Sequence, residues 1–171
     1  VAALGAERSA LGEGFSVSDL EWMDDSRSRR VPARLFWPAS ADNKKVPLIV
    51  FSHGIGSSRD GYTYLGRYWA SRGVASLHLQ HVGSDRMLWQ GNPLSLISRF
   101  QDAASEEEAV ARVQDFRFAL DRLLQAAEEG SRMGSVIEIL VLQALAHHTQ
   151  GSIPPALVPL ERALTLAEPE G

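Results

Sequence analysis

The stretch VPLIVFSHGIGSSRDGYTYLGRYWASRGVASLHLQH, residues 46–81, decides the fold class of this 171-residue chain. Residues 46–54 form an unbroken apolar run that ends in small residues, which is typical of a strand buried on both faces of a parallel sheet. Residues 61–72 carry large apolar side chains at helical spacing, and Gly73 follows as a helix stop. Residues 74–81 again have the pattern of a strand. This order of elements predicts a right-handed βαβ unit and hence a parallel sheet.

Outside this stretch the sequence predicts one more strand and several helices. The string VPARLFW, residues 31–37, alternates as a strand does. Residues 82–105 are irregular and are expected to hold a single helical turn. Residues 106–129 have the pattern of a long amphipathic helix. Two further helices are expected over residues 136–149 and 154–168, and together they form a helical hairpin.

We therefore expect an α/β protein with a mainly parallel sheet of roughly three or four strands, flanking helices and a C-terminal αα-hairpin. The run VIEILVL, residues 136–142, also fits a strand because of its β-branched residues. A helix is preferred there, because the apolar pattern continues through residues 143–147 without a turn signal. Residues 1–16 show little periodicity and are expected to form a loose leader.

Composition excludes several kinds of site and partner. Lysine and arginine total 17 against 21 aspartates and glutamates, so the net charge of −4 gives no reason to expect nucleic acid or an anionic membrane as a partner. The absence of cysteine excludes disulfides, thiolate nucleophiles and cysteine-ligated zinc. No stretch approaches the roughly 18 apolar residues of a membrane span. We expect a cytoplasmic protein without a metal or cofactor.

Three short motifs carry a resemblance to a known family: FSHG at residues 51–54, YLG at 64–66 and LQH-x-GSD at 79–85. The stretch that holds them resembles the dienelactone-hydrolase and platelet-activating-factor acetylhydrolase-like group of α/β-hydrolases. The similarity covers about residues 17–123. It implies a partial α/β-hydrolase-like domain there, acting on a small ester or lactone.

The sequence departs from this family in its last third. No G-x-S-x-G nucleophile elbow occurs anywhere in it, although the family's order of elements calls for one after the second strand. Residues 120–171 instead resemble the helical-repeat region of LuxR-type, maltose-activator-like transcriptional regulators. The DNA-binding motif of those regulators does not occur in the sequence, so their activity does not carry over. We interpret the chain as a fusion of a truncated hydrolase-like domain with a helical hairpin at residues 124–171.

The turn His53-Gly54-Ile55-Gly56 is the main candidate site. A backbone N–H that follows a strand-ending His-Gly pair can donate to a developing oxyanion. By resemblance, Gly54, Ile55 and Gly56 form the oxyanion hole, with the N–H of Ile55 as its donor. The alternative is that the glycines only permit a tight strand-to-helix turn.

Two histidines are the candidates for catalytic side chains. His81 ends the second strand and could approach His53, because the carboxyl ends of adjacent parallel strands meet. Ser52 and Asp85 would complete a polar pocket. Ser52 and His53 do not suit a nucleophile–base pair, since neighbours on a strand point to opposite faces. The alternative is that these side chains are simply hydrogen-bonded at strand ends.

Two functions follow from these patterns. The first is hydrolysis of an ester or lactone around His53, Ile55 and His81, although the nucleophile elbow is missing. The second is a non-catalytic role in assembly. An open sheet edge and the apolar face of a helical hairpin both need a cover, so we expect a homodimer that uses residues 135–168.

Overall fold

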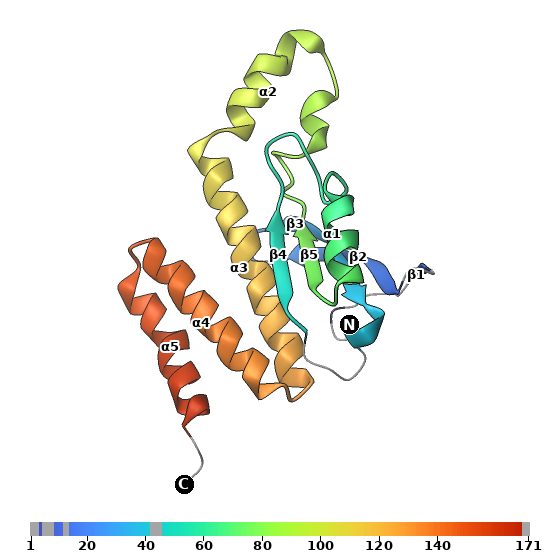
Figure 1. Ribbon diagram of the computed structural model, residues 1–171. Helices are drawn as coiled ribbons and strands as arrows, with labels where there is room; N and C mark the ends of the chain where they lie inside the picture. The colour runs from blue at the N-terminus through green and yellow to red at the C-terminus, as the bar shows by residue number, and fades with distance from the viewer. Residues whose placement is uncertain (1–3, 5–8, 12–13, 42–45, 169–171) are drawn as a thin grey trace. The chain divides into compact units, whose positions relative to one another are not determined.

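A computed structural model describes residues 4, 9–11, 14–41 and 46–168 of the chain. The chain divides into two compact units, a sheet unit over Leu4–Asp115 and a helical unit over Phe116–Gly171. Figure 1 shows the strands of the first unit and the helices of the second. None of the described helices is long and apolar enough to cross a membrane.

The sheet unit is built on five strands in the order β1-β2-β3-β5-β4. β4 and β5 run parallel, whereas the other pairings are antiparallel. The α/β class with flanking helices and a C-terminal helical hairpin is confirmed, with one correction: the sheet is mixed rather than mainly parallel. The strands are β1 (Ser9–Leu11), β2 (Phe15–Asp24), β3 (Arg29–Pro38), β4 (Leu48–Ser52) and β5 (Ala75–Leu79).

The antiparallel part of the sheet comes from a hairpin between β2 and β3. Its register runs from the pair Phe15 and Pro38 to the pair Asp24 and Arg29. β2 was not predicted, although its buried and exposed residues alternate over most of its length as they do in a strand with one covered face. Most of the expected leader, residues 1–16, lies outside the described residues; within it, β1 pairs with β2.

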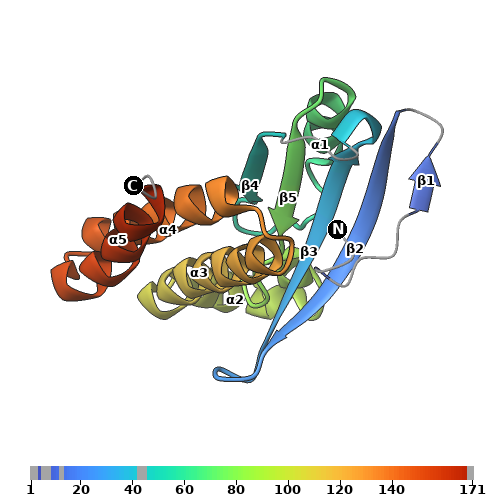
Figure 2. The same ribbon diagram turned by 90° about the horizontal axis from the view of Figure 1, so that it is seen from below.

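β4 lies at the edge of the sheet (Figure 2). Its only strand neighbour within the described part of the chain is β5, and its residues are half-buried or exposed. All five residues of β5 are buried. The expectation that residues 46–54 are covered on both faces is therefore wrong. An apolar run marks a strand, but the neighbours that pair with it decide how deeply it is buried.

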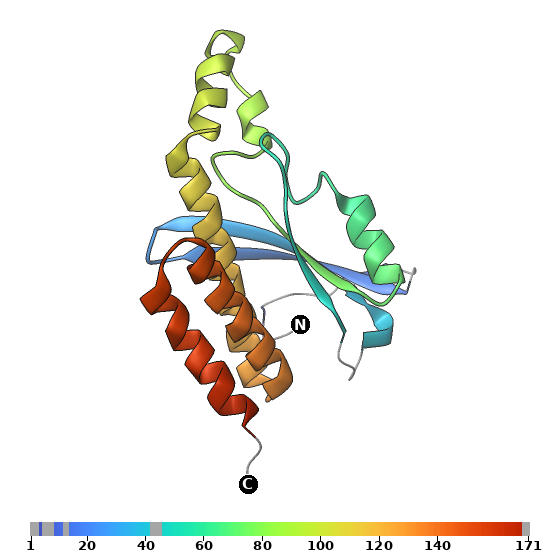
Figure 3. The ribbon, with the colours of Figure 1, turned by 60° about the vertical axis from the view of Figure 1, so that its left-hand side comes forward.

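Helix α1 (Thr63–Ser71) packs beside the sheet (Figure 3). A Cβ atom at Gly66 would lie 2.4 Å from the ring of Phe36, so only glycine permits this approach of helix and strand. Ala70 packs with Phe15 and Phe36 in one buried cluster. This packing fixes the βαβ unit whose strand ends carry the candidate site.

His78 lies on β5 among aromatic rings. Its ring centroid is 5.0 Å from that of Phe36, 4.9 Å from that of Phe51 and 6.1 Å from that of Trp69. Burial, with a smaller effect of the Arg34 charge, lowers the pKa of His78 to about 4. The side chain is therefore a neutral part of the core at neutral pH.

After β5 the chain forms two short 3-10 turns, η3 (Arg86–Trp89) and η4 (Pro93–Ser95), and then only helices. The helical unit holds a buried cluster of Ala127, Val136, Leu140 and Ala163. Residues 136–142 are helical, as preferred from the sequence. The remaining helices are α2 (Leu96–Ala103), α3 (Glu106–Glu129), α4 (Met133–Thr149) and α5 (Ile153–Ala167).

We expect the free energy of unfolding to fall as the pH drops from 6.5 to about 4, because the unfolded chain then binds a proton on His78 that the folded chain excludes. At about 1.36 kcal/mol for each pKa unit, the loss is roughly 3 kcal/mol. Urea unfolding of the wild type and of His78→Gln at several pH values measures it. The two proteins should differ in pH dependence over this window, and identical profiles would contradict a buried neutral His78.

Candidate active site

The candidate site lies where β4 and β5 end side by side. β4 ends at Ser52 and β5 ends at Leu79, and the two strands are paired in parallel up to these residues. The loops that follow, residues 53–57 and 80–85, therefore leave the sheet at the same edge. The first turns of α3, up to Asp115, supply the remaining side chains of the site.

The loop after β4 is held by hydrogen bonds on its backbone. The N–H of Gly56 donates to the carbonyl of Ser84 at 2.8 Å, and Trp89 Nε1 donates to the carbonyl of Gly56 at 2.7 Å. Gly56 has a φ of +78°, and a Cβ there would lie 2.8 Å from the Trp89 ring. Glycine is required at this position for both reasons.

His53 connects the two loops. Its ring is buried, and Nε2 lies 3.1 Å from the backbone nitrogen of His81, whose N–H it accepts. Nδ1 must then carry the ring proton, and it donates to the carbonyl of Gly54 at 2.7 Å. Burial is the main cause that lowers the pKa of His53. With both ring nitrogens bound to backbone groups, the neutral His53 acts as a structural link rather than as a general base.

His81 instead joins two side chains. Its Nε2 lies 2.9 Å from Ser52 Oγ, and its Nδ1 lies 3.0 Å from Asp115 Oδ2. The side chains of His81 and Asp115 are buried, whereas Ser52 is exposed at the end of the edge strand. A hydroxyl, an imidazole and a carboxylate in this order form the chain of hydrogen bonds that serine hydrolases use.

The carboxylate of Asp115 is also paired with two arginines. Arg29 Nε lies 2.9 Å and Arg27 Nη2 lies 3.0 Å from its Oδ1. Burial alone would raise the pKa of Asp115, but the hydrogen bonds from His81 and Arg29 outweigh burial and lower it. Asp115 is therefore a buried, ionised carboxylate at neutral pH.

Arg112 lies one helical turn before Asp115 and binds both loops. Its Nη2 donates to Ser52 Oγ at 3.1 Å and also to the carbonyl of His53. Its Nη1 donates to Ser84 Oγ at 3.0 Å. Burial lowers the pKa of Arg112, yet the guanidinium stays charged at any physiological pH. The site thus contains a fixed positive charge beside the serine.

The structure brings Ser52, His53 and His81 together, and Asp85 lies near enough for its charge to act on His53. The Asp85 carboxylate accepts from the N–H of Met87 at 3.0 Å, capping η3, and from Gln80 Nε2 at 2.7 Å. Gly54, Ile55 and Gly56 form the turn that follows β4. No group of side chains suited to a metal ion occurs among the described residues.

Two residues of the site were not predicted from the sequence: Arg112 and Asp115. With Glu108 they are spaced by four and three residues, which places all three on one face of α3. Glu108 pairs with Arg29 at 3.0 Å. The row of charged residues on one face of this amphipathic helix was the sequence signal that could have revealed Arg112 and Asp115.

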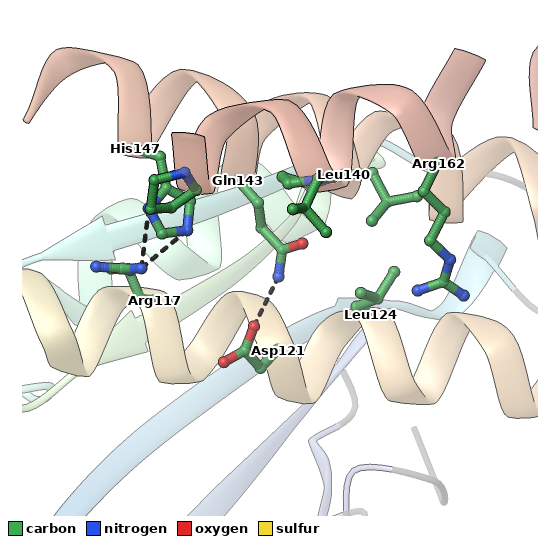
Figure 4. A pocket seen from close by; sticks show the side chains of 10 residues that line it. Arg117, Asp121, Leu124, Leu140, Gln143, His147 and Arg162 are labelled. Carbon is green, nitrogen blue, oxygen red and sulfur yellow. Dashed lines mark hydrogen bonds between the residues drawn. The ribbon is translucent and has the colours of Figure 1, made fainter. Parts of the chain in front are cut away.

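The helical unit has a cavity of its own, of about 450 Å³ (Figure 4). Its polar side chains mostly bind one another: Arg117 Nη2 lies 2.8 Å from His147 Nε2, and Gln143 Nε2 donates to Asp121 at 2.7 Å. These contacts connect α3 with α4. The residues that line the cavity are Arg117, Asp121, Leu124, Leu140, Gln143, His147, Pro155, Val158, Pro159 and Arg162.

Comparison with known proteins identifies relatives of the larger part of the chain. The family model for platelet-activating factor acetylhydrolase, isoform II, matches residues 15–139. No curated protein matches the chain in sequence.

Among solved structures, a cold-adapted esterase from an Arctic intertidal metagenomic library is 17% identical, with a TM-score of 0.49 over 72% of this chain and 50% of its own. An acetyl xylan esterase from Paenibacillus sp. R4 is 21% identical, with a TM-score of 0.37 over 47% of this chain and 27% of its own. An S-formylglutathione hydrolase from Agrobacterium tumefaciens is 10% identical, with a TM-score of 0.38 over 43% of this chain and 27% of its own. The chain thus spans half the length of the first esterase and about a quarter of the other two.

We expect Arg112→Lys to loosen the loop after β4, because an ammonium group cannot bind three acceptors with the geometry of a guanidinium. Hydrogen exchange of the Gly56 amide, which donates to Ser84, should become about tenfold faster, equivalent to about 1.4 kcal/mol. Arg72→Lys is the control, since Arg72 lies over the Tyr68 ring at the end of α1. Equal exchange in the wild type and Arg112→Lys would contradict this role.

Proposed function

The chain belongs to the platelet-activating factor acetylhydrolase isoform II family, and we propose that it acts as a carboxylic ester hydrolase on small esters or lactones. The turn of residues 53–56 serves as the oxyanion hole. The chain spans only part of its structural relatives, so the activity is proposed for the protein to which this chain belongs.

The observation that carries this proposal is the unused N–H of Ile55. No hydrogen bond between described residues uses it, although the backbone on each side is fixed: Arg112 donates to the carbonyl of His53, and Gly56 donates to Ser84. The Ile55 side chain is 41% exposed, so the turn is open to solvent and to a ligand. A donor that is held in place before reaction stabilises a developing oxyanion without a cost of reorganisation.

The charge of the site fits this chemistry. An ester is neutral, but its carbonyl oxygen becomes negative when a nucleophile adds to the carbon. The Arg112 guanidinium contacts the carbonyl of His53, two residues from Ile55, and its positive charge favours the addition step over the ground state. A lactone is an internal ester and passes through the same kind of intermediate.

We propose self-association through the helical unit as a second function, because large apolar side chains are exposed on both helices of the hairpin. On α4, Leu142 is 51% and Leu145 is 54% exposed; on α5, Leu157 is 47% and Leu164 is 59% exposed. Exposed apolar surface of this kind is typical of interaction sites. The occupant that we propose is the hairpin of a second copy. The resemblance of residues 120–171 to helical repeats supports it, since such repeats bury their apolar faces against neighbours.

Ile55→Pro should lower the kcat for p-nitrophenyl acetate at least 100-fold, roughly the effect of removing one oxyanion-hole donor. The matched control, Ile55→Val, keeps the N–H and should keep the activity, with circular dichroism verifying that both variants are folded. Equal rates in the two variants would exclude the turn as the oxyanion hole.

Light scattering should give the wild type the mass of a dimer and give Leu142→Asp with Leu145→Asp the mass of a monomer, because two carboxylates cannot be buried unpaired in an apolar interface. Ser131→Asp with His148→Asp, which adds the same charge at exposed polar positions, should remain dimeric. A monomeric wild type, or a double variant that remains dimeric, would refute self-association through α4.

A further inference from the structure

We infer that the cavity of the helical unit is a binding site for a small amphipathic carboxylate, that is, a ligand with one carboxylate group and a short apolar chain. All the residues that line the cavity lie on helices α3, α4 and α5, within one compact unit of the chain. The inference concerns this unit alone and does not rest on the proposed ester hydrolase function.

The cavity is built from one face of each of the three helices. Along α3 the lining residues are Arg117, Asp121 and Leu124, and along α4 and α5 they recur at the same intervals of three or four residues. Residues at these intervals lie on the same face of a helix. The volume of about 450 Å³ falls within the range of roughly 300–1,000 Å³ that small-molecule sites occupy. The three faces therefore enclose a space that suits a small ligand.

One end of the cavity holds a positive charge whose partners in the described part of the chain are neutral (Figure 4). Arg117 Nη2 lies 2.8 Å from His147 Nε2 and 3.0 Å from Nδ1, and Nη1 donates to Gln150 Oε1 at 3.4 Å. Burial, and next the charge of Arg117, lowers the pKa of His147, so its ring is neutral at neutral pH. A carboxylate binds a guanidinium more strongly than neutral acceptors do, and it can accept from two N–H groups at once. A ligand carboxylate can therefore replace the long contact with Gln150.

The charges of the lining favour a single negative charge on the ligand. Arg117 and Arg162 are positive and Asp121 is negative, which leaves a net charge of +1. Asp121 accepts from Gln143 Nε2 at 2.7 Å. Arg162 donates to Glu128, which is not a lining residue, and both side chains are exposed, so solvent screens this pair. One carboxylate on the ligand balances the charge of the lining.

Farther along the cavity the wall is apolar. Leu140 is 2% exposed and belongs to the buried cluster of the helical unit, and Leu124 packs against that cluster. Figure 4 shows Leu124 and Leu140 away from the end that holds Arg117 and His147. Contact with such a wall removes an alkyl chain from water, which stabilises the complex. A charged group at one end and leucines farther along together match an amphipathic ligand.

The cavity is separate from the exposed side chains proposed for self-association. Leu142, Leu145, Leu157 and Leu164 are not among the residues that line it. Ligand binding and self-association can therefore be tested on different residues of the same helices.

Isothermal titration calorimetry of the whole chain with octanoate tests the site. Octanoate should bind once per chain with a Kd of about 1 mM or lower. Octanol, which has the same alkyl chain without the charge, should bind at least about tenfold more weakly, because it cannot form charge-assisted hydrogen bonds with Arg117. No binding of octanoate, or equal binding of octanoate and octanol, would overturn the inference.

Arg117→Gln removes the charge but keeps a hydrogen-bond donor, and it should weaken octanoate binding at least about tenfold while octanol binding stays the same. The matched control is Arg72→Gln, which removes the same charge from an exposed position of the sheet unit and should bind octanoate as the wild type does. A folded Arg117→Gln with the wild-type affinity for octanoate would overturn the role of Arg117 and with it the site.

Val158→Asp decides the question if circular dichroism shows that Arg117→Gln does not fold. Val158 lines the cavity but is 69% exposed, so a polar side chain is tolerated there, and the new carboxylate should repel octanoate and weaken its binding. Thr165→Asp, at an exposed position of α5 outside the lining, should bind octanoate as the wild type does. Equal affinities in Val158→Asp and Thr165→Asp would overturn the site. None of these measurements involves an ester, so the proposed hydrolase function can fail while this site stands.

Discussion

The site depends on one buried carboxylate. The side chain of Asp115 is fully buried; the charges of Arg27 and Arg29 balance its own, and it accepts a hydrogen bond from His81. Removing a charge from water costs several kcal/mol, which only close partners offset, and losing one partner of such a group typically costs about 3–5 kcal/mol. The pairing joins α3 to the hairpin of β2 and β3 and to the end of β5. It therefore determines where the first turns of α3 lie within the sheet unit.

The chemistry of the site follows from this constraint. With Asp115 in place, the same face of α3 brings Arg112 to Ser52 and to the turn after β4. The carboxylate also fixes which nitrogen of His81 carries the proton, so that the other nitrogen is free to accept from Ser52. The ion pairs of Asp115 and the orientation of His81 toward Ser52 thus depend on the same carboxylate.

Sequence reasoning predicted the elements that local patterns define. The βαβ unit of β4, α1 and β5 and the helices α3, α4 and α5 follow from periodicity and turn residues. β4 was expected to be buried on both faces, whereas it is an edge strand, because the sequence of a strand does not show which other strands pair with it. Ser52 and His81 were placed at one crevice, but Asp115 is 34 residues from His81, and no local pattern links them. Only tertiary packing selects which carboxylate on α3 pairs with which histidine.

Nitrogen-15 NMR of the protein labelled in its histidines shows whether Asp115 orients His81 toward Ser52. At neutral pH, His81 should be the tautomer with its proton on Nδ1, its Nε2 should have the chemical shift of an unprotonated nitrogen, and Asp115→Asn should remove this preference. A wild-type His81 that carries its proton on Nε2, or that averages between the two tautomers, would show that Asp115 does not orient the ring.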